Sequence, residues 1–202
     1  MKSLRYKFVT GALLASVAAV PVSAMADSNS ASGASPSAAV NLDFRVEIPG
    51  ILRFQVGGAG GVNEILFEPA VDTLGDGSDV VATSGGDLGP GTVTVDLFSN
   101  AGPVTITETN NSVNGLHNGD PSETIPYSEI LTSSSDDTNF PAPVLSNTDE
   151  NTSAPAPTGG NGKITNRTVA WTYTYDNTAI YPAGTYGTAT NGGRVTYTAA
   201  AP

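Results

Sequence analysis

The sequence contains no cysteine, one histidine and one tryptophan in 202 residues. Without cysteine there are no disulfides, no thiol nucleophile and no thiolate metal site, and a single histidine excludes the usual zinc clusters. The fold must therefore be held by a hydrophobic core. The chain is long enough for one, because a domain of about 150 residues buries roughly two thirds of its surface. We expect one domain that is indifferent to reductant.

Long apolar runs are also scarce. The one that stands out covers about Phe8 to Val20, follows three basic residues, and is followed by small residues ending at Ala24-Met25-Ala26. This order is typical of a secretory signal peptide cleaved after Ala26, and the run is short for a membrane span of about 20 residues. We expect a bacterial protein secreted through the inner membrane into the periplasm, the cell surface or the extracellular matrix, with no membrane insertion after cleavage. An uncleaved N-terminal anchor is the alternative.

Basic residues are few. Lys2, Arg5 and Lys7 leave with residues 1–26, so that five of the eight basic residues remain against nineteen acidic ones, a net charge of −14. A chain this acidic repels nucleic acid and anionic membrane surfaces. Both are therefore excluded as expected partners.

Helical periodicity is missing outside the first 26 residues, and short alternating segments rich in Val, Thr and Tyr take its place. Gly and Pro separate these segments, which favours an all-β fold, an antiparallel immunoglobulin-like β-sandwich of roughly eight strands, with a closed barrel as the alternative. We expect a hairpin over 92–109 turning at 100–103, a strand over 166–177, and a closing hairpin that ends near the C-terminus. The segments 133–147 and 148–162 are polar and Pro-rich, which predicts surface loops.

Residues 38–48 form a candidate assembly strand, and they alternate strictly from Val40 to Ile48. The apolar members of this candidate assembly strand are Val40, Leu42, Phe44, Val46 and Ile48, and every residue between them is polar. The preceding residues 27–37 are Ser, Ala, Gly, Asn, Asp and Pro, a composition that predicts a disordered polar leader. A strand on such a tether can pair within its own domain, residues 38–202, or within a neighbouring copy, and the pattern alone leaves both possibilities open.

Candidates for chemistry are few. His117 lies in a turn-rich segment without a nucleophile elbow nearby, so we expect no catalytic residues and no enzymatic activity. Asp72, Asp76 and Asp79 occupy a Gly-rich stretch whose oxygen ligands suit Ca²⁺, although Asp-Gly pairs are also ordinary turn formers. Calcium is the only cofactor that the sequence raises.

Three aromatic residues alternate in the segment 166–177: Trp171, Tyr173 and Tyr175. Exposed rings would form a stacking platform for a glycan, whereas buried rings would form the core face of a central strand. The chain has few other large apolar rings, which favours the core.

The signal peptide, polar leader, alternating strand and closing "PAGTY…GRVTYTA" segment resemble exported bacterial immunoglobulin-like surface proteins, and the layout is similar to that of chaperone–usher fimbrial subunits. The resemblance implies that an N-terminal strand is donated to the next subunit. We therefore expect a non-enzymatic structural or adhesive surface protein that self-assembles or binds other surface-protein subunits, for example in a biofilm. A secreted carbohydrate-binding module is the alternative.

Overall fold

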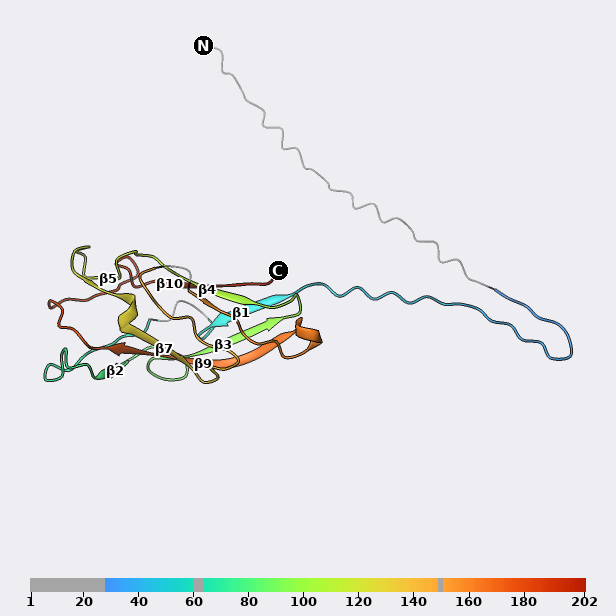
Figure 1. The fold of residues 1–202 in the computed structure, drawn as a ribbon, viewed down its shortest axis with the longest axis horizontal. Coiled ribbons are helices and arrows are strands. Elements are labelled where there is room, and N and C mark those ends of the chain that lie inside the picture. Colours follow the sequence, from blue (N-terminus) through green and yellow to red (C-terminus); the bar gives the residue numbers. More distant parts are fainter. Residues whose placement is uncertain (1–27, 60–63, 149–150) are drawn as a thin grey trace, which may run out of the picture. The chain divides into compact units, whose positions relative to one another are not determined.

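The computed structural model describes residues 28–59, 64–148 and 151–202. The expected signal peptide, residues 1–26, lies outside the described residues. The described chain divides into a leading segment, residues 28–48, and a folded unit, Pro49–Pro202 (Figure 1). No described helix has the length and apolar character needed to cross a membrane.

The larger sheet of the folded unit is built around its longest strand. Its members are β1 (Leu52–Val56), β2 (Asp79–Val81), β3 (Thr92–Ser99), β7 (Ile130–Ser134) and β9 (Thr165–Asp176). β9 pairs with β3 from Thr165 to Thr172 and, beyond the end of β3, with β2. β7 pairs with the other edge of β9, and β1 pairs with β3. Among the described strands β1, β2 and β7 each have a single partner, so each lies at an edge of this sheet.

The second sheet has the order β10-β4-β8, with β10 (Val195–Ala200), β4 (Thr105–Asn110) and β8 (Thr152–Ser153). β5 (Leu116–His117) and β6 (Thr124–Ile125) form a separate small pair. Two 3-10 turns, η1 (Tyr127–Glu129) and η2 (Gly160–Gly162), complete the described elements. All strand pairings are antiparallel, which confirms the expected all-β class; the described residues form ten strands, against the eight expected.

One hydrophobic core joins the two main sheets. β3 buries Val93, Val95 and Leu97 on alternate positions, as its sequence predicts for a strand with one face in a core. Ile106 of β4 and Trp171 of β9 are each 0% exposed in the same cluster. The period-two pattern is therefore sufficient to place these side chains, and the expected strand over 166–177 is confirmed as β9.

The hairpin predicted over 92–109 is wrong. β3 belongs to the larger sheet and β4 to the smaller one, so the turn between them carries the chain across the core. Pro103 has no backbone N–H for a ladder, and Gly102 adopts a φ of +130°, which an L side chain rarely adopts. Both strands have an apolar face, and burying the two faces against each other requires them to lie in opposite sheets.

Two further expectations are corrected. The segment 133–147 is not only a surface loop, because Phe140, Pro143 and Leu145 lie in the core. The polar residues around them hide this contribution in the sequence. The closing hairpin is also absent: β10 pairs with β4, and residues 183–186 are not a strand.

Candidate functional site: an assembly segment and an open side of the fold

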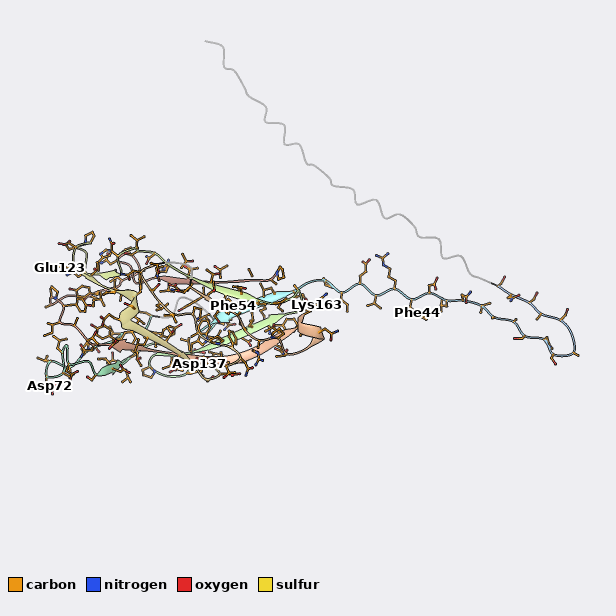
Figure 2. The ribbon with its side chains drawn as sticks, in the orientation of Figure 1. Phe44, Phe54, Asp72, Glu123, Asp137 and Lys163 are labelled. Atoms are coloured by element: carbon orange, nitrogen blue, oxygen red, sulfur yellow. The ribbon has the colours of Figure 1, made fainter. Side chains whose placement is uncertain are left out.

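The five apolar residues of the candidate assembly strand are exposed in the described chain. Their relative exposures are 62% for Val40, 77% for Leu42, 86% for Phe44, 82% for Val46 and 78% for Ile48. None of residues 38–48 belongs to a strand of the described sheets, and Arg45 and Glu47 form an ion pair on the polar positions. Figure 2 shows the side chain of Phe44 on this extended segment. The chain thus carries a strand-patterned segment whose apolar face is in water, which is unfavourable by roughly 1.5–3 kcal/mol for each such side chain relative to burial.

On one lateral side of the folded unit, a segment of the chain covers the core between the two sheets. Residues 139–145, here called the closing segment, connect the edge strands β7 and β8. Thr132 Oγ1 of β7 donates to the carbonyl oxygen of Pro143 (3.0 Å), and Ser153 Oγ of β8 donates to that of Pro141 (2.5 Å). Phe140, which is 0% exposed, inserts its ring between the sheets at a centroid distance of 5.8 Å from Trp171. The core on this side is sealed.

The other lateral side, here called the open side, is formed by the edge strands β1 and β10. In the described part of the chain, β1 pairs only with β3 and β10 only with β4. Leu52 is 38% exposed, and the other core-facing residues of both strands are half-buried. These half-buried residues are Phe54, Val56, Val195, Tyr197 and Ala199.

Tyr197 anchors β10 to the core. Its ring lies 5.2 Å from that of Trp171, and its hydroxyl lies 3.1 Å from the hydroxyl of Tyr173 on β9. Burial raises the pKa of Tyr173 to about 12, and burial together with the neighbouring Tyr173 and Glu108 raises the pKa of Tyr197 well above its usual value. β10 is therefore firmly attached along its inner face while its outer backbone edge has no strand partner among the described residues.

The aromatic row of the glycan alternative lies in the core. Trp171, Tyr173 and Tyr175 have relative exposures of 0%, 7% and 6%, so they present no open ring face to a sugar. Sequence reasoning did not single out Tyr181 and Tyr186, whose half-buried rings lie 6.4 Å apart at 59°. Their only signal is the "YPAGTY" spacing across a turn. The tilt between these two rings makes them unsuitable as a flat stacking platform.

The three carboxylates of the calcium hypothesis do not come together. No group of three His, Cys, Asp or Glu side chains among the described residues is arranged to hold a metal ion. Asp76 accepts hydrogen bonds from the hydroxyl and the amide of Ser78, which lower its pKa, and Asp79 begins β2. Figure 2 shows Asp72 at one end of the folded unit and Lys163 at the other end. In this loop the carboxylate of Asp76 stabilises a turn.

His117 lies in the short strand β5 and is half-buried, and its Nδ1 accepts from the amide of Gly119 (3.3 Å). This bond is a local turn contact and brings no nucleophile to the imidazole.

Comparison with known proteins assigns neither a family nor a fold neighbour: no family model, no curated protein and no solved structure matches this chain.

Proposed function

We propose that this protein is an exported, non-enzymatic structural subunit of a bacterial surface or its matrix, with an immunoglobulin-like sandwich fold. It assembles when residues 40–48 of one copy join a sheet of another. The observation that carries this proposal is the set of five exposed apolar side chains at alternate positions, on a segment that is not a strand of the described sheets. Exposed periodic apolar residues of this kind mark an interaction site.

Insertion as a strand suits both the apolar even-numbered positions and the polar odd-numbered positions of residues 40–48. The backbone of residues 40–48 gains a ladder of hydrogen bonds, and the even-numbered side chains enter a core while the polar odd-numbered ones remain in water. Burial of each of the five apolar side chains contributes about 1.5–3 kcal/mol, which is offset in part by the ordering of the segment. A structural role fits this energetics, because several buried side chains per junction give a long-lived polymer.

The experiment compares two variants of the chain that begins at Asp27. In the first, Leu42, Phe44 and Val46 are replaced by Asn; in the matched control, Asn41, Asp43 and Glu47 are replaced by Ser. We expect the control to assemble and the first variant to stay monomeric, as measured by light scattering after size exclusion and by electron microscopy. Both should remain folded, because the replaced residues precede the folded unit.

Deletion of residues 27–48 provides a second arm. The truncated protein should stay folded and monomeric and should bind an added peptide that spans residues 38–48. A full-length protein that remains monomeric at high concentration would contradict the proposal. So would assembly that is unaffected by the Asn substitutions.

A further inference from the structure

We infer that the strand which accepts the donated segment is β10, at the open side of the fold. This inference rests on the proposed function and specifies its partner site: residues 40–48 of a second copy pair antiparallel with the free edge of β10. The donated segment becomes a fourth strand of the smaller sheet, beyond β10 in the order β10-β4-β8.

The choice between the two lateral sides follows from what fills them. At the sealed side, the closing segment bridges β7 and β8 and places Phe140 and Leu145 in the core at 0% and 4% exposure. At the open side, no described segment connects β1 with β10, and their core-facing residues are half-buried or, at Leu52, exposed. A row of apolar side chains entering at the open side would complete the cover that the closing segment supplies at the other side.

Between the two strands of the open side, β10 has the less protected edge. Its sequence, VTYTAA, contains neither a charged residue nor a proline, the two features that block strand addition at natural sheet edges. β1 carries Arg53, whose guanidinium lies 3.9 Å from the Asp96 carboxylate and 5.9 Å above the Phe98 ring. β10 is also one residue longer than β1, which offers a longer ladder.

The donated segment and β10 match in pattern. On β10 the residues Val195, Tyr197 and Ala199 are turned inward, while Thr196, Thr198 and Ala200 are exposed. When Phe44 lies opposite Tyr197 in an antiparallel ladder, the apolar residues of the donor share the inner face with Val195 and Ala199. Arg45 and Asp43 then lie beside Thr196 and Thr198 on the outer face, where neither charge is buried.

The natural absence of cysteine makes this pairing directly testable by disulfide formation. An isotope-labelled chain carrying Arg45→Cys is mixed with an unlabelled chain carrying one acceptor cysteine, and both chains begin at Asp27. The acceptor variants are Thr196→Cys and Thr198→Cys on β10. Matched controls on exposed positions of the other edge strands are Gln55→Cys on β1 and Ser133→Cys on β7. Equal reaction of the four acceptor thiols with a small thiol reagent verifies that they are equally accessible.

We expect mixed disulfides between labelled and unlabelled chains, identified by mass spectrometry, in several-fold excess for one of the β10 positions over both controls. Assembly with preferential cross-linking to Gln55→Cys or Ser133→Cys, or with no preference, would overturn the acceptor site and leave the proposed function intact. A mixture that remains monomeric in light scattering would overturn the proposed function itself, and the acceptor site with it.

Discussion

At the scale of a single residue, the ring of Trp171 on β9 connects the two sheets. This ring is 0% exposed and makes edge contacts with Phe140 of the closing segment and with Tyr197 of β10. Trp171→Ala should therefore lower the free energy of unfolding by about 3–5 kcal/mol, the range for truncating a buried aromatic side chain. Urea denaturation followed by far-UV circular dichroism measures this loss. Trp171→Phe, which keeps a ring, should cost clearly less, and equal losses in the two variants would show that ring packing is not the source.

The buried tyrosine pair should make the fold sensitive to alkaline pH. The pKa of Tyr173 is about 12 in the folded protein, against about 10 in an unfolded chain. Between these values the unfolded chain loses its proton first, so the stabilising effect is complete below pH 10 and is lost as the pH rises towards 12. The free energy of unfolding should thus decrease from pH 9 upward, and Tyr173→Phe should show a shallower decrease. Identical slopes in the wild-type protein and the variant would exclude Tyr173 as the cause.

At the scale of an element, Asn177 fixes the loop before β2. Its side chain is 0% exposed, donates from Nδ2 to the carbonyl oxygen of Thr73 (2.7 Å) and accepts at Oδ1 from the amide of Gly75 (3.0 Å). Asn177→Ala leaves both backbone groups without this partner and should cost about 1–3 kcal/mol. The same variant should accelerate hydrogen exchange at Gly75, whereas Asn114→Ala, a change of an exposed asparagine, should affect neither measurement. Unchanged exchange at Gly75 would show that the loop is held by other contacts.

At the scale of the whole molecule, charge opposes assembly. The chain beginning at Asp27 carries a net charge of −14, so approaching copies repel each other at low ionic strength. Assembly should become faster and more complete as NaCl rises from about 20 mM to about 300 mM, because the Debye length falls below ~10 Å over this range. Light scattering at constant protein concentration checks this expectation. Assembly that weakens with added salt would instead indicate that ion pairs between copies dominate the junction.

Local sequence pattern was sufficient to predict individual strands. β3 and β9 each place apolar and polar residues alternately over a long run, and the burial of Val95 and Trp171 follows directly from that period. The absence of cysteine likewise required a packed core. The alternation of residues 40–48 is as clear as that of β9. A period-two pattern of this kind indicates a strand whose apolar face needs a partner.

Only the tertiary structure decided where such partners lie. Pattern placed β3 and β4 in one hairpin, whereas burying their apolar faces against each other put them in opposite sheets. Phe140 lies in a segment that the sequence predicts to be a polar loop, yet its ring is 0% exposed and packs edge-on against Trp171 in the core. The open side between β1 and β10 is likewise invisible in the sequence, because an unpaired edge is a property of strand order, and strand order is set by contacts between residues far apart in the chain.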